Sequence, residues 1–83
     1  MDADEELWAR AQVGDAAAFG VLYERHVRAV YNFCFRRTAN AAQAEDLTSA
    51  VFAEVWEIRG RTRLSQPSLL PWLLGVAHNL LRI

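Results

Sequence analysis

The sequence predicts an all-α fold, a compact bundle of three to four helices in which residues 1–83 form a single domain. Apolar residues recur every three or four positions in four segments, as they do along amphipathic helices. Turn-forming breaks at residues 14–15, 38–40 and 60–68 separate these segments. A chain of 83 residues also has room for only one modest hydrophobic core, which favours a single domain.

The first two helices are predicted from the residues that begin them and from their apolar stripes. Residues 4–13 open with carboxylates, which complement the positive end of a helix dipole, and place Leu7, Trp8 and Ala11 on one face. Asp15 is a natural N-cap for a long second helix. The apolar stripe of that helix comprises Phe19, Leu22, Tyr23, His26, Val27, Val30, Tyr31 and Cys34. We expect this stripe to be core, with His26 packed within it rather than serving as a ligand.

The third helix is predicted to follow Asn40, which forms a capping-box pattern with Gln43. Its apolar stripe comprises Ala44, Leu47, Thr48, Val51, Phe52, Val55 and Trp56. Its other face carries Glu45, Ser49, Glu54 and Glu57. This helix is therefore amphipathic, with an acidic outer face.

The fourth helix is predicted to begin near Ser68, because serine can act as an N-cap and Pro71 is tolerated in a first turn. Its apolar stripe comprises Leu69, Trp72, Leu73, Val76, Ala77 and Leu80. The opposite, small polar face carries Gly75, His78, Asn79 and Arg82. At helical spacing Trp56 and Trp72 are expected to be core residues rather than platforms for stacked bases. The sequence shows no C-cap after this helix, which suggests a fragment of a longer protein.

Composition excludes several classes of protein. The single cysteine rules out an internal disulfide, and its spacing from the two histidines matches no metal site, so no metal and no cofactor are expected. The sequence has no phosphate-binding glycine loop and no pairing of a nucleophile with a base, so we expect no enzyme. No apolar run approaches the roughly 20 residues that span a bilayer, and the acidic start is unlike a signal peptide. A soluble, cytoplasmic protein with no membrane partner is expected.

Charge and apolar content both point to a partner surface. The formal net charge is only -1, so any nucleic-acid surface must be local. At 53% the apolar fraction slightly exceeds the usual range, which favours apolar surface left for a partner. All nine basic residues are arginine, which suits bidentate contacts to phosphate or bases but is equally produced by a GC-rich coding bias.

Three arginines, Arg59, Arg61 and Arg63, concentrate positive charge just before the fourth helix. Such a cluster attracts phosphate whatever the net charge, because salt screens charges that lie further than about 8 Å away. The residues alone leave two interpretations open. One is a phosphate-binding loop, and the other is a solvated arginine loop beside a polar surface.

Three blocks of the sequence together resemble a known family. They are GDAAAFGVLYERHVRAVYNFCFRR, AEDLTSAVFAEVWE and PWLLGVAHNLLR, in the order and spacing of region 2 of an extracytoplasmic-function (ECF) sigma factor. The paired patterns GDxxAFxxLY and AEDLTxxVFxxVW are more specific than any single short motif. The resemblance implies a domain that docks on bacterial RNA polymerase, recognises the minus-ten promoter element and helps to open the duplex. The family's other promoter-reading domain, the helix-turn-helix of region 4, is absent from these residues.

The resemblance also implies which residues bind the polymerase. The third helix corresponds to the segment that docks on the coiled coil of the largest polymerase subunit. The implied docking residues are Glu45, Asp46, Ser49 and Glu54. Ser49 and Ala50 stand where the family usually has glutamine and an acidic residue, a departure that bears on polymerase affinity. Without the resemblance, these carboxylates are ordinary solvated charges on a helix face.

For DNA, the resemblance places residues 59–70 in a loop next to the non-template strand, above a pocket that holds a flipped promoter base. Asn79 matches the asparagine that closes the family's WLxxxAxN pattern, and an amide offers a base edge both a donor and an acceptor. His78 stands where the family often has arginine, which predicts either a weaker phosphate contact or one that depends more on pH. The implied DNA-binding residues are Arg59, Arg61, Arg63, Gly75, His78, Asn79 and Arg82.

Two functions of different class follow from the sequence. The first is a promoter-recognition domain that acts with the RNA polymerase core on the non-template strand of the minus-ten element. The alternative is a helical protein-interaction module that keeps the fold without reading DNA. The resemblance further implies an anti-sigma factor that covers the same surfaces.

Overall fold

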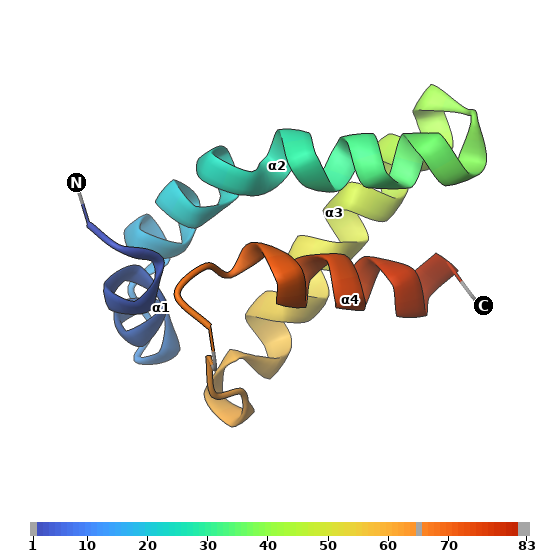
Figure 1. The fold of residues 1–83 in the computed structure, drawn as a ribbon. Coiled ribbons are helices and arrows are strands. Elements are labelled where there is room, and N and C mark those ends of the chain that lie inside the picture. The colour runs from blue at the N-terminus through green and yellow to red at the C-terminus, as the bar shows by residue number, and fades with distance from the viewer. Residues whose placement is uncertain (1, 65, 82–83) are drawn as a thin grey trace.

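A computed structural model describes residues 2–64 and 66–81 as a bundle of α-helices (Figure 1). The helices are α1 (Asp4–Gln12), α2 (Ala16–Thr38), α3 (Ala41–Ile58) and α4 (Leu70–Leu81), and a short 3-10 helix, η1 (Arg59–Arg61), follows α3. The described residues contain no strand. The predicted all-α fold with four helical segments is confirmed.

The long helix α2 contacts each of the other three α-helices, which pack around it (Figure 1). α3 returns across α2, and α4 packs against both of them. α1 packs against α2 and η1, at the end of the bundle where the chain leaves α3. None of the helices in the described ranges has the length and apolarity needed to cross a membrane.

One hydrophobic core joins all four helices. Its buried apolar members are Leu7, Trp8, Ala11, Ala18, Leu22, Val30, Cys34, Ala44, Val51, Phe52, Val55, Leu69, Leu73 and Ala77. All but Ala18 lie on the stripes predicted from the sequence, and His26 is also buried, as expected. Burial raises the pKa of the Cys34 thiol, so this cysteine stays protonated and behaves as a small apolar side chain.

Local hydrogen bonds explain where α2 and α3 begin. The Asp15 carboxylate accepts a hydrogen bond from the Ala18 amide at 3.1 Å. The Asn40 side chain likewise accepts one from the Gln43 amide at 2.9 Å. Both predicted N-caps are therefore confirmed. Between them, Ala39 ends α2 in the left-handed conformation (φ 52°), which turns the chain into α3.

The structure refines three expectations about the stripes. Tyr23, predicted as core, is 42% exposed because it lies at the edge of the seam between α2 and α3. Trp56 and Trp72 pack against the core but are only partly buried. α4 begins at Leu70, whose amide donates to the Ser68 hydroxyl at 3.2 Å. Ser68 thus accepts from the first amide of α4, but Leu69 directly precedes the helix and its carbonyl accepts from the Leu73 amide at 3.1 Å.

Candidate nucleic-acid and polymerase interfaces

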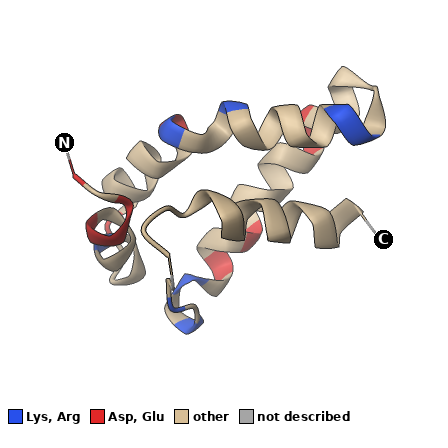
Figure 2. Ribbon diagram, viewed as in Figure 1, with Lys and Arg blue, Asp and Glu red and all other residues tan. Residues whose placement is uncertain are grey.

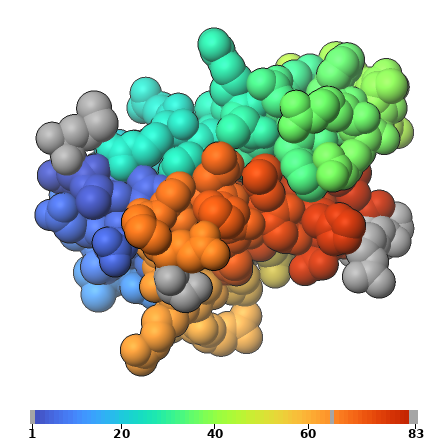
Figure 3. Space-filling view, viewed as in Figure 1, coloured from blue at the N-terminus to red at the C-terminus, as the bar shows by residue number. Residues whose placement is uncertain are grey.

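The connection between α3 and α4, here called the arginine loop, comprises residues 59–64 and 66–69. It begins with η1 and then runs to α4 without regular secondary structure. Figure 2 shows its arginines as a blue cluster at the end of α3. In Figure 3 the first part of the loop projects from the surface below α4. The arginine-rich stretch of the sequence is therefore a protruding edge of the domain.

The Arg59 side chain is engaged in contacts within the protein. Its Nε donates to the Ala11 carbonyl at 3.1 Å, and its Nη1 donates to the Trp56 carbonyl at 2.6 Å. The guanidinium also lies over the Trp56 ring, 3.6 Å from the ring centroid. Arg59 thus satisfies carbonyl groups near the ends of α1 and α3, and it fixes the start of the loop.

Arg61 and Arg63 are exposed, and within the described ranges neither forms an ion pair. Both line a pocket of about 450 Å³ between the loop and α1. Trp8 and Gln12 contribute the α1 wall of this pocket, and Glu5 adds a carboxylate. The pocket therefore combines two exposed arginines with a polar amide and a carboxylate, whereas Trp8 is only 2% exposed and contributes little accessible surface.

A second hollow of about 200 Å³ lies on the α4 side of the loop. Arg63 lines both hollows, together with Leu64. The Trp72 ring lines the second hollow and meets the Trp8 ring edge to face, with centroids 5.4 Å apart. The two tryptophans are thus packed against each other while one lines each hollow.

Helix α1 holds the first part of the arginine loop through side-chain donors. The Gln12 amide nitrogen donates to the carbonyls of Arg59 at 2.8 Å and Thr62 at 2.6 Å. The Trp8 indole nitrogen donates to the same Thr62 carbonyl at 3.3 Å. Two α1 side chains therefore fix the backbone on both sides of Arg61.

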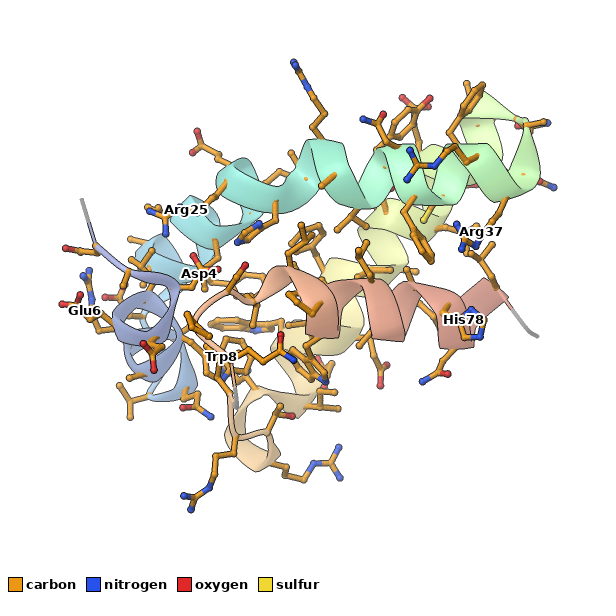
Figure 4. All side chains as sticks on the ribbon, in the orientation of Figure 1. Asp4, Glu6, Trp8, Arg25, Arg37 and His78 are labelled. Carbon is orange, nitrogen blue, oxygen red and sulfur yellow. The ribbon has the colours of Figure 1, made fainter. Side chains whose placement is uncertain are left out.

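A buried carboxylate at the other end of α1 holds the last residue of the loop. Asp4 is 6% exposed, and its Oδ2 accepts a hydrogen bond from the Leu69 amide at 2.7 Å. The same oxygen lies 2.7 Å from His26 Nε2, and Oδ1 accepts from Arg25 Nη1 at 2.7 Å. Figure 4 shows Asp4 between α1, Arg25 and the beginning of α4. One carboxylate therefore joins α1, α2 and α4.

The pKa of Asp4 reports two opposing effects. Burial alone raises the pKa, because it disfavours the charged form. The hydrogen bonds from Leu69, Arg25 and His26 stabilise the carboxylate and outweigh burial, so the pKa of Asp4 lies below its ordinary value of 3.8. Asp4 is consequently ionised at neutral pH despite its burial.

The predicted polar face of α4 lies apart from the arginine loop. Gly75, His78 and Asn79 are all exposed on this helix, and Arg82 lies outside the described residues. Asn79 is nine residues beyond the start of α4, which corresponds to roughly 13 Å along a helix. A Cβ atom added to Gly75 would meet no atom within 4 Å, so the surface there is open. The structure therefore presents two separate polar patches, namely the arginine loop before α4 and the exposed residues on α4 itself.

The four predicted docking residues of α3 are exposed but do not form one cluster. Glu45 and Ser49 line a hollow of about 430 Å³ against α2, whereas Asp46 lines another hollow near the end of α4. Glu54 lies nine residues after Glu45, which at 3.6 residues per turn places it on the opposite side of the helix. The predicted set therefore spreads over half of the circumference of α3.

The hollow between α2 and α3 is the more apolar part of this surface. Its α2 wall contains Tyr23, Val27 and Tyr31, and its α3 wall contains Glu45 and Ser49. Two tyrosines beside a carboxylate offer a partner both apolar area and a charged group. The exposed Tyr23 that departs from the predicted core stripe is thus part of a hollow on the surface.

Sequence reasoning missed the polar residues of α1, namely Asp4 and Gln12. A signal for Asp4 was present, since it lies one helical turn before Leu7 and Trp8, on the same buried face. His26 also occupied an apolar stripe, so two polar groups on buried faces were available to pair. Gln12 carried no comparable signal, because its two carbonyl partners lie in an irregular segment far along the chain.

Comparison with known proteins identifies the family to which the chain is similar. Residues 22–82 match the sequence model of a family described as Sigma-70 region 2. The chain is 39% identical over 75 residues to the ECF RNA polymerase sigma factor BldN of Streptomyces coelicolor, covering 90% of this chain and 28% of that protein. It is 32% identical over 74 residues to the ECF RNA polymerase sigma factor SigL of Mycobacterium tuberculosis, covering 86% of this chain and 40% of that protein.

A third relative is the ECF RNA polymerase sigma factor SigK of Mycobacterium bovis, to which the chain is 30% identical over 74 residues, covering 89% of this chain and 40% of that protein. The chain thus spans between 28% and 40% of the length of these relatives. No solved structure matches the chain significantly. The match to the family model begins within α2, whereas the match to BldN covers 90% of the chain and therefore includes part of α1.

Proposed function

The chain belongs to the sigma-70 region 2 family, and we propose that it is the domain of an ECF sigma factor that recognises the minus-ten promoter element for RNA polymerase. The observation that carries this proposal is the pair of exposed arginines, Arg61 and Arg63, that line the pocket between the arginine loop and α1. Such a pair suits single-stranded DNA, because arginines bind the phosphates of the strand. On this proposal the domain binds and is not an enzyme, and it acts in the cytoplasm.

In the proposed complex the arginine loop positions the non-template strand. Arg61 and Arg63 bind phosphates, because both are exposed and face the pocket. Arg59 keeps the loop in place instead, since two of its nitrogens already donate to carbonyls. A base unstacked from the duplex enters the pocket between the loop and α1, where a preformed site offsets part of the cost of unstacking.

The polar face of α4 reads sequence in this proposal. Asn79 offers its amide to a base edge, and His78 lies beside it as a weaker phosphate contact than arginine. Open space around Gly75 allows the strand to approach the helix backbone closely. Because Asn79 and the arginine loop lie at different points along α4, the bound strand follows the helix and contacts both patches. Arg82, outside the described residues, stays a sequence prediction for the same face.

The α3 surface docks on the polymerase in this proposal. Asp46 and Ser49 face outward from α3, and the hollow against α2 adds the apolar contacts that a stable interface needs. Glu45 lies at the α2 edge of this surface, and Glu54 lies at the far edge of α3. The proposed partner is the coiled coil of the largest subunit, whose arginines complement these carboxylates. An anti-sigma factor would compete for the same surface.

A protein-interaction module without DNA binding is the second candidate function. The observation that favours it is exposed apolar area on α2, where Val21, Tyr23 and Phe35 are each more than 40% exposed. Such residues serve any protein partner and need no nucleic acid. This candidate predicts polymerase or inhibitor binding with no dependence on the arginine loop.

One titration separates these functions. Fluorescent non-template oligonucleotides carrying different minus-ten sequences are titrated with the protein bound to core polymerase, at several salt concentrations. We expect one sequence to be preferred, and replacing Arg61 or Arg63 with alanine to reduce the salt slope by about 0.7 for each lost single-strand phosphate contact. The substitution Arg36→Ala, at an exposed arginine of α2, is the matched control. If the wild type binds all sequences equally and the arginine variants keep its salt slope, the promoter-recognition function is rejected and the interaction module is the remaining candidate.

A further inference from the structure

Helix α1 holds both ends of the arginine loop, although the match to the family model begins only at residue 22. Near its C-terminal end, Gln12 donates to the carbonyls of Arg59 and Thr62. At its N-terminal end, Asp4 accepts from the Leu69 amide, directly before α4. The described segment that carries Arg61 and Arg63 lies between these two attachments.

The attachment at Asp4 is the stronger of the two. A hydrogen bond to an ionised carboxylate is roughly twice as strong as one between neutral groups. Asp4 is nearly inaccessible to water, and the Leu69 side chain is fully buried, so water competes poorly for the Leu69 amide. Arg25 and His26 hold the carboxylate from the α2 side, which fixes its orientation. The beginning of α4 is thereby tied to a rigid part of the bundle.

The attachment at Gln12 fixes the beginning of the loop. One amide group donates at 2.8 Å and 2.6 Å to carbonyls that are three residues apart. The Trp8 indole adds a bond to the second of these carbonyls, Thr62, at 3.3 Å. Together they set the direction in which the chain leaves η1. That direction decides where Arg61 and Arg63 lie relative to the pocket.

The middle of the loop has little structure of its own. Among the described residues from 63 to 68, the backbone forms no hydrogen bond to the backbone of another segment. Its shape is therefore determined by its two fixed ends and by the packing of Leu64 against the core. A segment of this kind becomes mobile when either end is released.

We propose that α1 is a two-point clamp that sets the shape of the arginine loop, with Asp4 and Gln12 as positioning residues for the DNA contacts. Neither side chain is proposed to touch DNA. Each acts through the backbone of the loop, and so through Arg61 and Arg63. The effect of the clamp on DNA binding rests on the proposed function. Its mechanical part, the effect of Asp4 and Gln12 on the order of the arginine loop, concerns the protein alone.

The mechanical part is tested by NMR relaxation of the backbone amides in the full chain. The variants are Asp4→Ala and Gln12→Met, and Glu6→Gln and Gln43→Met are matched controls on exposed positions of α1 and α3. We expect the order parameters of Arg63 and Leu64 to fall from about 0.85 to below about 0.6 in both of the first two variants, and that of the Leu69 amide to fall in Asp4→Ala, which removes its acceptor. Amides in the middle of α2 and α3 should keep their values, as should the loop in both controls.

Asp4→Ala removes the partner of two basic side chains and could unfold the chain. Gln12→Met leaves no buried charge unpaired, so it tests the clamp independently of that risk. Asp4→Asn keeps an oxygen that can accept from Leu69 and should be intermediate between Asp4→Ala and the wild type. An arginine loop that is as ordered in Gln12→Met and Asp4→Asn as in the wild type overturns the clamp.

The functional part is tested with the polymerase-bound protein and the same labelled oligonucleotides. We expect Gln12→Met and Asp4→Asn to weaken binding several-fold to about tenfold for every minus-ten sequence, because phosphate positioning is lost rather than base recognition. The effect of each variant should be non-additive with Arg63→Ala and additive with Asn79→Ala. Mobility in the loop without any change in affinity would overturn the positioning role. If the wild type itself shows no sequence preference, the proposed function fails, and the clamp is then decided by the NMR measurement.

Discussion

The seam where α2, α3 and α4 meet and the arginine loop are held by different kinds of interaction. The seam is made of fully buried apolar side chains such as Leu22, Val51 and Leu73. The loop is held at its ends by hydrogen bonds from Asp4 and Gln12. Apolar packing is non-directional and roughly proportional to buried area, whereas each hydrogen bond fixes a particular geometry. The seam therefore supplies stability, and the few polar atoms at the loop supply shape.

The largest effect is expected from a change in the seam. Leu73→Ala removes a fully buried side chain from the first turn of α4 and should lower the free energy of unfolding by about 2 to 5 kcal/mol. The partly buried Leu47, changed in the same way, should cost less. Urea unfolding followed by circular dichroism measures both values. If Leu73→Ala costs no more than Leu47→Ala, the seam is not the source of stability.

Asp4→Asn should lower the free energy of unfolding by less than Leu73→Ala does. Unlike Leu73→Ala, it should also change how the free energy of unfolding depends on pH. The loss at neutral pH should be about 1 to 3 kcal/mol, the cost of leaving buried donors without a carboxylate. Because the folded-state pKa of Asp4 lies below 3.8, its contribution is fully present above the unfolded-state value and is lost as pH falls through the folded-state value. Unfolding free energy measured from pH 6 to pH 2 should therefore fall less steeply in the variant.

Part of the acid dependence should survive in that variant. The amide of Ala18 and the Arg10 side chain also lower the pKa of Asp15, so this N-cap contributes in the same direction in both proteins. Glu6→Gln, which removes an exposed carboxylate from the same turn of α1, is the control for general charge effects. Identical acid slopes in the wild type and Asp4→Asn would show that Asp4 is not the buried carboxylate that the loop depends on.

Asn79→Ala tests whether the polar face of α4 differs from the loop in function. Loss of a base-edge contact should weaken binding by about 1 to 3 kcal/mol on the preferred minus-ten sequence and leave substituted sequences nearly unaffected. Arg61→Ala should instead weaken binding similarly on all sequences. The titrations with polymerase-bound protein measure both patterns. Equal losses on all sequences for Asn79→Ala would remove it from base recognition.

The smallest effect is expected at Gly75, where stability and binding should move in opposite directions. Alanine has a higher helix propensity than glycine, and nothing lies within 4 Å of the added Cβ, so Gly75→Ala should raise stability by about 0.5 to 1 kcal/mol. If DNA approaches the helix backbone there, the same variant should bind the preferred oligonucleotide more weakly. Thermal unfolding and oligonucleotide titration of one protein sample give both numbers. Unchanged binding would show that the strand does not approach α4 at this point.

The features that were predicted correctly from the sequence are those that depend on residues close together in the chain. The N-caps Asp15 and Asn40 act over three residues, and the apolar stripes repeat within each helix, so helix number and most boundaries followed from short windows. Tyr23 departed from its stripe because exposure at the edge of a seam depends on how far the neighbouring helix extends. The spacing of apolar residues identifies which face of a helix is buried, but it does not show which residues at the edge of that face stay exposed.

The parts that could not be predicted depend on contacts between distant segments. Arg59 was grouped with Arg61 and Arg63 by spacing, yet its guanidinium is directed at carbonyls of α1 and α3. Likewise, nothing in the first residues of the chain indicates that Asp4 accepts from an amide 65 residues away. Composition identified the charged loop correctly. Which of its arginines form hydrogen bonds within the protein and which are exposed is determined by tertiary structure.

The span of that last contact has a consequence for the order of folding. Bringing together two points 65 residues apart costs chain entropy before any contact offsets it, whereas the α2–α3 hairpin needs only a short turn. The Asp4–Leu69 bond is therefore expected to form after the rate-limiting step, so that it slows unfolding without accelerating folding. During synthesis α1 leaves the ribosome before α2, α3 and α4, yet it finds this partner only when the beginning of α4 has followed. Of these four helices, the one that is made first is thus expected to form its final contact last.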